Sequence, residues 1–240
     1  IEPKRTYEKA LEISDLVVLD RERCVLCWRC VRFCDEISGD PFIQLVDRGA
    51  GTQILTFNDE PFDSYFSGNT VQICPVGALM NHEYRVAPRV WEIKPVPTIC
   101  PHCPVGCNMS YDTRPDRAAG GRNTIRRTMP RQNEEVNEIW ICDKGRFVHH
   151  YTDSKRRLKN PLVRNKEELT HPTWEEATKA AAEKLQENLV ILASGKLANE
   201  DLFNLKSLAD QTGGKAYLYS HMAGGEMTTR VGVGADTNFG

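Results

Sequence analysis

The grouping of the cysteines constrains this chain more than any other feature of its sequence. Nine cysteines occur in 240 residues, in close groups, and none follows Cys142. A secreted disulfide scaffold instead spreads an even number of cysteines through a small domain. Closely spaced pairs of the form C-x2-C are typical of thiolates that bind metal. We therefore predict a protein organised around metal centres.

The first group lies in residues 23–36, whose sequence is RCVLCWRCVRFCDE, with the spacing C-x2-C-x2-C-x3-C. Bacterial ferredoxins use this run, in which three thiolates bind one [4Fe-4S] cube and the fourth binds another cube. A remote cysteine followed by proline completes the first cube, and VQICPVGAL contains one. The predicted ligands of a first [4Fe-4S] cluster are Cys24, Cys27, Cys30 and Cys74.

The second half of this ferredoxin pattern lacks its ligands. Its three cysteines would stand ten, seven and four residues before Cys74, and those positions hold Ser64, Ser67 and Thr70. Cys34 would have bound that missing cluster, so we expect it to be a buried thiol without iron. A zinc site with four cysteine ligands remains an alternative for the first group, although such sites usually pair two C-x2-C knuckles.

The second group lies in ICPHCPVGCNMSYD, and its remote partner lies in IWICDKGRF. The spacing is C-x2-C-x3-C-x34-C, which differs from that of ferredoxins and indicates a different cluster-binding fold. Gly106 gives the loop the freedom to wrap closely around a metal centre. The predicted ligands of a second [4Fe-4S] cluster are Cys100, Cys103, Cys107 and Cys142.

These motifs carry a family resemblance. C-x2-C-x3-C followed distantly by CDKGR resembles the iron–sulfur segment that opens molybdopterin oxidoreductases such as formate dehydrogenase. Together with ERCVLCWRCVRFCDE, VQICPVGAL and VNEIWICDKGRF, the chain is more similar to the large cluster-carrying peripheral-arm subunits of bacterial NADH–quinone oxidoreductase, respiratory complex I. The resemblance covers about residues 14–220, and its specific motifs lie between residues 23 and 147.

The resemblance implies an electron-relay subunit of the NADH:quinone oxidoreductase (translocase), with no substrate-converting site in this chain. The first [4Fe-4S] cluster would lie on the path from flavin to quinone, and the second would lie off it. A further [2Fe-2S] and a further [4Fe-4S] cluster are expected upstream in the full-length chain. The implied partners are the flavin- and cluster-carrying subunits of the complex I peripheral arm, at the cytoplasmic face of the bacterial inner membrane.

Molybdenum is not expected. In formate dehydrogenase-like proteins the metal ligand follows a strand equivalent to KAYLYS, but the stretch here is YSHMAGGEMTTR, without cysteine. We expect Ser220 to be a turn residue. In the molybdenum relatives a lysine matching Lys144 lies between cluster and pterin, so Lys144 is expected to lie beside the second cluster. The alternatives are a catalytic molybdopterin enzyme such as an NAD-linked formate dehydrogenase, and a zinc-stabilised structural protein.

The expected fold class is α+β followed by α/β. A leading segment, residues 1–22, would precede a degenerate two-cluster ferredoxin-like domain with one [4Fe-4S] cluster at residues 23–90. Residues 91–155 would form a small, β-rich [4Fe-4S] domain of molybdopterin-oxidoreductase type. Residues 156–240 would begin a doubly wound molybdopterin-oxidoreductase-like scaffold domain, because helix and strand patterns alternate there.

The pattern in the cluster-binding part predicts several elements. FIQLV and TQILTF should form a hairpin around DRGAG. We further predict a short helix at residues 63–70, a Pro-containing link at residues 82–98, and strands at NMSYDTR and NEIWICD. The basic stretch between those strands, residues 114–132, is expected to be an exposed loop, or a docking loop for an acidic neighbouring subunit.

The C-terminal part has clearer local signals. Thr173 and Glu176 form a capping box before a helical pattern. LVILAS is typical of a buried parallel strand. Asn199 is expected to cap a second helix that ends at Gly213 and Gly214, before the strand KAYLYS.

Charge and hydropathy exclude other classes. The net charge of −2 shows no general nucleic-acid footprint, and no apolar run approaches the roughly 18 residues of a transmembrane helix. The start at Ile1 leads us to expect a partial chain. Four further residues near the motifs have expected roles: Trp28 as a water shield, Arg146 as a counter-charge, and His149 and His150 as surface or interface residues.

Overall fold

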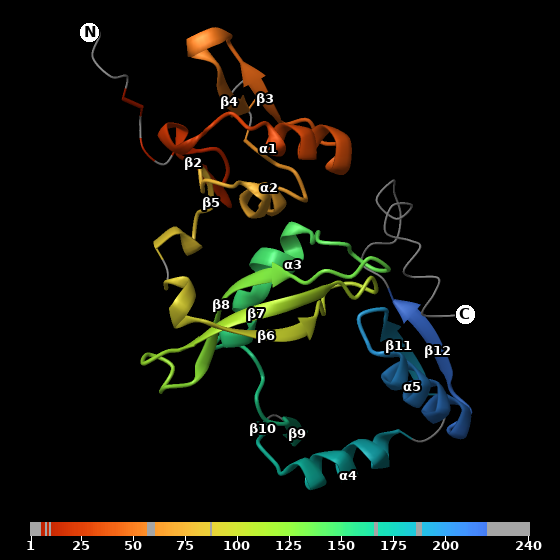
Figure 1. The fold of residues 1–240 in the computed structure, drawn as a ribbon. Coiled ribbons are helices and arrows are strands. Elements are labelled where there is room, and N and C mark those ends of the chain that lie inside the picture. Colours follow the sequence, from red (N-terminus) through yellow and green to blue (C-terminus); the bar gives the residue numbers. More distant parts are fainter. Residues whose placement is uncertain are drawn as a thin grey trace. The chain divides into compact units, whose positions relative to one another are not determined.

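The structure is a computed structural model that describes residues 6–7, 9, 11–56, 61–86, 88–165, 168–185 and 189–219. The chain divides into two units. Unit 1 consists of residues 1–99 and 107–150, and unit 2 consists of residues 100–106 and 151–240. Figure 1 labels their elements.

Unit 1 begins with a small antiparallel sheet. Its order is β1-β2-β5, and its strands are β1 (Leu11–Glu12), β2 (Val17–Leu19) and β5 (Leu79–Asn81). β2 lies in the middle, and all three of its residues are buried. This strand therefore anchors the hydrophobic core that also holds Phe33, Ile43 and Phe62.

A helical segment and a hairpin follow the sheet. α1 (Arg29–Arg32) continues into a π-helical turn, Phe33–Ser38, which ends at Gly39 with φ of 68°. β3 (Ile43–Val46) and β4 (Gln53–Thr56) pair antiparallel around the 3-10 turn Gly49–Gly51. The predicted hairpin is confirmed for these residues, and Phe57 lies outside the described residues.

The predicted helix at residues 63–70 is wrong in its bounds, because α2 spans Gly68–Ile73. The Ser64 hydroxyl accepts a hydrogen bond from the Phe66 amide at 3.2 Å, and the Ser67 amide donates to the Ser64 carbonyl at 3.1 Å. Serine side chains that bond nearby backbone amides stabilise turns in competition with helix. The helix therefore starts only after this turn.

A second antiparallel sheet has the order β6-β7-β8, with strands β6 (Lys94–Ile99), β7 (Asn108–Pro115) and β8 (Asn123–Pro130). The predicted Pro-containing link at residues 82–98 holds the 3-10 turns Tyr84–Val86 and Val90–Glu92, and β6, which was not predicted, begins within it. Pro95 and Pro97 have no N–H to donate, but β6 is an edge strand that pairs only with β7. Because the two prolines are two residues apart, both can place the missing N–H on the unpaired side.

β8 corrects two further predictions. It occupies much of the stretch that was expected to be a loop. The predicted strand at NEIWICD is also wrong, because residues 137–141 contain only turn residues, one isolated β-bridge of Glu138 to Asn133, and irregular chain. The arginines of β8 are paired with nearby aspartates: Arg127 Nε lies 2.5 Å from an Asp112 oxygen, and Arg126 lies 2.7 Å from Asp116. The basic side chains of β8 are therefore compatible with a position in the sheet, because aspartates neutralise them. α3 (Asp143–Phe147) and the 3-10 turn Val148–Asp153 follow.

Unit 2 contains a short hairpin and one βαβ unit. The hairpin pairs β9 (Val163–Asn165) with β10 (Glu168–Thr170). α4 (Trp174–Lys184) has the predicted capping box, with both hydrogen bonds between Thr173 and Glu176. β11 (Val190–Ser194) and β12 (Lys215–Tyr219) pair parallel, and α5 (Asn199–Gln211) connects them and contacts both.

Two details of unit 2 differ from expectation. Ala198 occupies the N-cap position of α5 and Asn199 is the first helical residue, so Asn199 does not cap it. β11 is only partly buried, since Val190 is 60% and Leu192 is 70% exposed among the described residues, whereas Ala193 is buried. Alternate residues of a strand face opposite sides, so only one face of β11 is covered there.

Candidate metal centres

The first ligand loop coils through two unusual backbone conformations. Cys24 follows the 3-10 turn Arg21–Arg23, and Leu26 and Trp28 have positive φ angles of 53° and 64°. Such angles are uncommon for residues other than glycine and mark positions that the surrounding structure holds in place. Cys27 lies between these two residues, and Cys30 follows in α1.

Cys74 reaches this loop from α2. It stands directly after the last residue of α2, and α2 contacts both α1 and β5. The four predicted ligands of the first cluster, together with apolar side chains, line one cavity. The residues that line it are Leu19, Cys24, Val25, Cys27, Arg29, Cys30, Ile54, Cys74, Val76, Ala78 and Leu79. Trp28 is half exposed and does not line the cavity, so the apolar cover comes from Val25, Ile54 and Val76 instead.

Backbone amides point at the sulfurs of this cavity. The amides of Ala78 and Leu79 donate to Cys74 Sγ at 3.2 and 3.5 Å. Backbone amides also bond the thiols of Cys24 and Cys30 and favour their thiolate forms. Amide hydrogen bonds to sulfur are one of the means by which proteins set the potential of an iron–sulfur cluster.

Burial opposes negative charge on the same thiols. It raises the pKa of Cys30 to about 12 and also raises the pKa of Cys24, and the neighbouring cysteines add to both shifts. Thiolates gathered in an apolar cavity therefore need a cationic centre to balance them, as metal ligands do.

A zinc ion and a [4Fe-4S] cube require different arrangements of four thiolates. Among the residues that the structure describes, no group of three or more His, Cys, Asp or Glu side chains is placed to hold one metal ion. A zinc ion would require its four thiolates to converge on one point, whereas in a cube each thiolate binds a different iron. The four thiols that line this cavity supply the sulfur donors that either group requires.

Cys34 lies in the core beside this site. Its side chain is fully buried, as predicted, and burial raises its pKa to about 12, with smaller contributions from Cys30 and Asp40. The three positions that would complete its cluster are buried too, and their hydroxyls form hydrogen bonds. Ser64 donates to Asp40 at 3.1 Å, Ser67 to Asp143 at 2.5 Å, and Thr70 to the Ser67 carbonyl at 2.7 Å.

The ligands predicted for the second cluster are distributed over both units. Cys107, directly before β7, and Cys142, at the N-cap of α3, belong to unit 1. Cys100 and Cys103 belong to unit 2. Gly106 has φ of 64°, the conformation for which a glycine was expected in this loop.

The segment around Cys142 is fixed to α2, which the sequence did not reveal. The Asn69 side chain donates to the Ile141 carbonyl at 3.0 Å and accepts from the Ile141 amide at 3.3 Å. The Asp143 carboxylate accepts from the Gly68 amide at 2.8 Å and from the Ser67 hydroxyl. These partners stand more than 70 positions apart in the chain, so no local spacing could have indicated them.

Arg146 completes this link. It is buried and donates to Asn69 at 2.8 Å and to Gln72 at 2.9 Å. Burial lowers its pKa to about 10 and raises that of Asp143 to about 6, while the proximity of the two groups opposes both shifts. Cys142 also raises the pKa of Arg146, and the expected role of Arg146 as a counter-charge to the second cluster stays a prediction.

The remaining predicted residues lie as follows. Lys144 is partly buried in α3. His149 is buried, so the expectation of a surface residue is wrong for it. His150 is exposed, and its Nε2 lies 2.8 Å from a carboxylate oxygen of Glu83. Ser220 lies outside the described residues.

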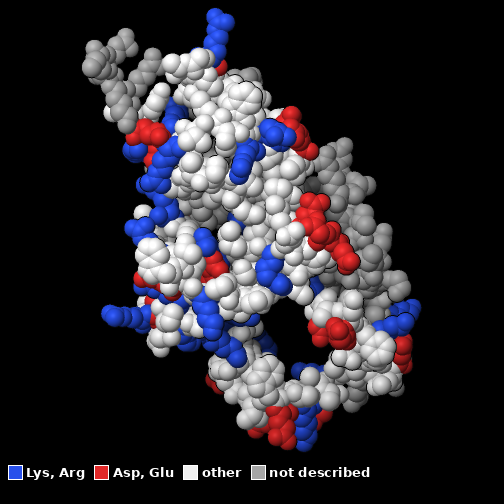
Figure 2. Space-filling view, viewed as in Figure 1, with Lys and Arg blue, Asp and Glu red and all other residues white. Residues whose placement is uncertain are grey.

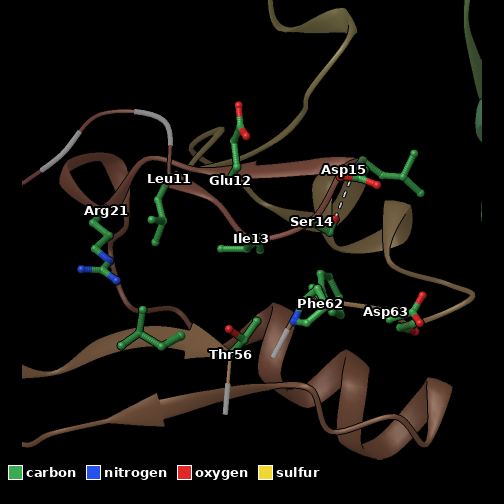
Figure 3. Close-up of a pocket in the computed structure, with 13 residues that line it drawn as sticks. Leu11, Glu12, Ile13, Ser14, Asp15, Arg21, Thr56, Phe62 and Asp63 are labelled. Atoms are coloured by element: carbon green, nitrogen blue, oxygen red, sulfur yellow. Dashed lines mark hydrogen bonds between the residues drawn. The ribbon is translucent and has the colours of Figure 1, made fainter. Parts of the chain in front are cut away.

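A second cavity of unit 1 has a different character. Figure 3 shows it between β1 and the segment around Phe62, with the acidic residues Glu12, Asp15 and Asp63 and the cation Arg21 among its lining. No cysteine lines it. The cysteines predicted to bind the clusters therefore do not line this cavity.

Family models match three consecutive parts of the chain. The ferredoxin-like domain of NADH-quinone oxidoreductase subunit 3 matches residues 14–80. The molybdopterin oxidoreductase Fe4S4 domain matches residues 93–154, and the molybdopterin oxidoreductase domain matches residues 157–238. The class of protein so defined has a ferredoxin-like part followed by the iron–sulfur and α/β parts of molybdopterin oxidoreductases.

Curated relatives agree with these matches. An NADH-quinone oxidoreductase subunit of Streptomyces coelicolor is 46% identical over 210 residues, which are 86% of this chain and 24% of that protein. Subunit 3 of the Thermus thermophilus enzyme is 46% identical over 184 residues, 77% of this chain and 22% of that protein. The chain belongs to the family of NADH–quinone oxidoreductase subunits that includes these two proteins. It spans about a quarter of the length of either one.

Proposed function

We propose that this chain is the part of an electron-relay subunit of NADH–quinone oxidoreductase that carries two [4Fe-4S] clusters between flavin and quinone. The observation that carries the proposal is the cavity lined by Cys24, Cys27, Cys30 and Cys74. The same residues fall within the match to the subunit 3 ferredoxin-like domain. The first cluster lies on the electron path, and the second lies off it.

A [4Fe-4S] cluster supplies one-electron transfer when bound. The four thiols of the cavity hold it, and the positive φ angles at Leu26 and Trp28 let the ligand loop wrap around it. Amides on the sulfurs of Cys24, Cys30 and Cys74 stabilise negative charge there. Leu19, Ala78 and Leu79 form a buried apolar side of the lining, and solvent access is a further determinant of the potential of such a cluster.

The second cluster is bound by Cys100, Cys103, Cys107 and Cys142. Its support is the spacing of the four cysteines and the match of residues 93–154 to the Fe4S4 domain. Lys144 lies beside this cluster and balances part of its negative charge. No molybdenum is bound, and residues 156–240 serve as a scaffold of doubly wound type without a cofactor. Upstream of this chain, the subunit carries a further [2Fe-2S] and a further [4Fe-4S] cluster.

The partners are the flavin- and cluster-carrying subunits of the peripheral arm. Residues 84–131 contain nine basic and three acidic residues, although the whole chain has a net charge of −2. Lys and Arg side chains gather in Figure 2 over the side where Figure 1 places the β7–β8 hairpin. This surface fits an acidic neighbouring subunit.

The location is the cytoplasmic face of the bacterial inner membrane, in the peripheral arm of the complex. Among the helices that the structure describes, none is both long and apolar enough to cross a bilayer. The chain is therefore proposed to reach the membrane through its partner subunits.

Metal and sulfide analysis of the anaerobically purified chain, with EPR after reduction, tests the proposal. About eight irons and eight sulfides per chain, with two tetranuclear signals, are expected from two cubes. About one molybdenum per chain would instead identify a catalytic molybdopterin enzyme such as an NAD-linked formate dehydrogenase. Zinc in place of iron would contradict both and leave the structural zinc protein.

A further inference from the structure

The N-terminal end of α2 and the turn before it form hydrogen bonds with the residues on both sides of Cys142. On one side, the amide group of Asn69 makes two hydrogen bonds to the backbone of Ile141. On the other side, Asp143 accepts from the Gly68 amide, and its own amide donates to the Tyr65 carbonyl at 2.8 Å. Cys142 is thus held between two fixed neighbours.

These hydrogen bonds are costly to break because the groups that form them are buried. Asn69 is fully buried, Ser67 is 1% exposed, and Asp143 is 7% exposed. Breaking one bond would leave a buried polar atom without a partner, which costs more than the bond itself contributes. Gly68 permits the close approach, because a Cβ atom there would lie 2.6 Å from Arg146 Nε and 3.0 Å from an Asp143 oxygen.

The other end of the same helix leads into Cys74. α2 has six residues and ends at Ile73, so one short helix connects the residues that bond the Cys142 segment to Cys74, a predicted ligand of the first cluster. Ser67 stands where the ferredoxin pattern would place a cysteine, and its hydroxyl now bonds Asp143. The site of the absent cluster has therefore become an attachment point for the ligand segment of the other cluster.

From this geometry we infer that Asn69 is a positioning residue for the second cluster, since it fixes the backbone beside Cys142 while α2 fixes Cys74. The inference rests on the proposed function only in that Cys142 binds a cluster. Asn69 does not touch iron, and it acts through the backbone of Ile141. The consequence is a ligand whose position is set before the cluster is assembled.

The test uses the full-length subunit within its complex and compares Asn69→Ala with the wild type. Cys142→Ser and Cys74→Ser variants first identify the EPR signals of the second and first clusters. In Asn69→Ala we expect the signal assigned through Cys142 to shift or to fall severalfold, with the signal assigned through Cys74 unchanged. Loss of both signals would show a merely structural role, and retention of both unaltered would overturn the inference.

Hydrogen exchange provides a readout that does not depend on the cluster. The Ile141 amide should exchange roughly tenfold faster in Asn69→Ala, since its acceptor is removed. Asn69→Asp keeps an acceptor oxygen and should restore the slow exchange. Asn81→Ala, which removes a turn-capping side chain elsewhere in unit 1, should leave Ile141 unchanged. Unchanged exchange in Asn69→Ala would overturn the inference.

The two readouts separate the inference from the proposed function. If Cys142→Ser removes no signal, the assignment of the second cluster fails. Hydrogen exchange at Ile141 would still decide whether Asn69 holds the segment. If Asn69→Ala does not assemble into the complex, Asn69→Asp replaces it in the EPR comparison, because it keeps the acceptor for the Ile141 amide but loses the donor bonds to the Ile141 and Phe66 carbonyls. The signal assigned through Cys142 should then still shift, and an unaltered signal would overturn the inference.

Discussion

The two halves of the ferredoxin-like part follow the same spacing, but one half has cysteines at the predicted ligand positions and the other has hydroxyl side chains. In one half, four thiols face a cavity lined by apolar side chains. In the other half, the matching positions hold Ser64, Ser67 and Thr70, whose buried hydroxyls bond protein groups and leave Cys34 in the core. At the positions where the ferredoxin pattern would place ligands, each buried hydroxyl thus has a protein partner, as buried polar groups require.

The largest effect is expected from Cys74→Ser, which removes a thiolate from the half that keeps its cavity. The first cluster should be lost or converted to a three-iron form, because no other described thiol lines that cavity beyond the remaining three. Iron analysis and EPR of the anaerobic protein measure the change. A variant that kept the full signal of the first cluster would show that Cys74 is not its ligand.

The next largest effect tests the half that has lost its cluster. Gly68→Ala should lower the free energy of unfolding by about 1–3 kcal/mol, because its Cβ would meet a buried arginine that Asn69 and Gln72 hold in place. Denaturant unfolding measures the loss.

Gly51→Ala is the matched control, since a Cβ there makes only an ordinary contact, 3.7 Å from the Asp47 Cβ. Equal effects in the two variants would show that the close approach at Gly68 has no special cost.

Features of the fold that depend on neighbouring residues could be predicted from the sequence, whereas features that depend on contacts between distant residues could not. The β3–β4 hairpin and the capping box of α4 follow from neighbouring residues, and both were predicted. β8 was missed because its arginines indicate a loop unless their aspartate partners on β7 and in the turn are known. The Asn69 link was missed for the same reason, since it joins residues 72 positions apart.

The cysteine positions could also be predicted only where their spacing along the chain indicated them. Spacing alone proposed the set of Cys24, Cys27, Cys30 and Cys74, and the structure places all four around one cavity. The assignment of these residues as ligands stays a prediction until iron is measured. The burial of Cys34 was also predicted, but the polar network that surrounds its lost ligands was not, because hydroxyl side chains carry no spacing pattern.

A smaller effect is expected from Cys34→Ser. Both clusters should remain, and stability should fall by about 1 kcal/mol, because a hydroxyl in the core must be desolvated where a thiol was not. Iron content, EPR and denaturant unfolding measure these quantities together. Loss of either cluster would contradict the separation of the two halves, since it would make Cys34 a ligand.

The smallest effect concerns reactivity, and it separates Cys34 from its neighbour Cys30. Burial raises the pKa of both thiols to about 12. Because the thiolate is the reactive form and Cys34 is fully buried, alkylation of Cys34 in the cluster-loaded protein should be slow at pH 8 and should speed up as the pH rises. Cys30 should stay blocked at each pH, since iron occupies its sulfur. Mass spectrometry of alkylated peptides reports both residues in one experiment, and labelling of Cys30 at the rate of Cys34 would mean that neither thiol holds a cluster.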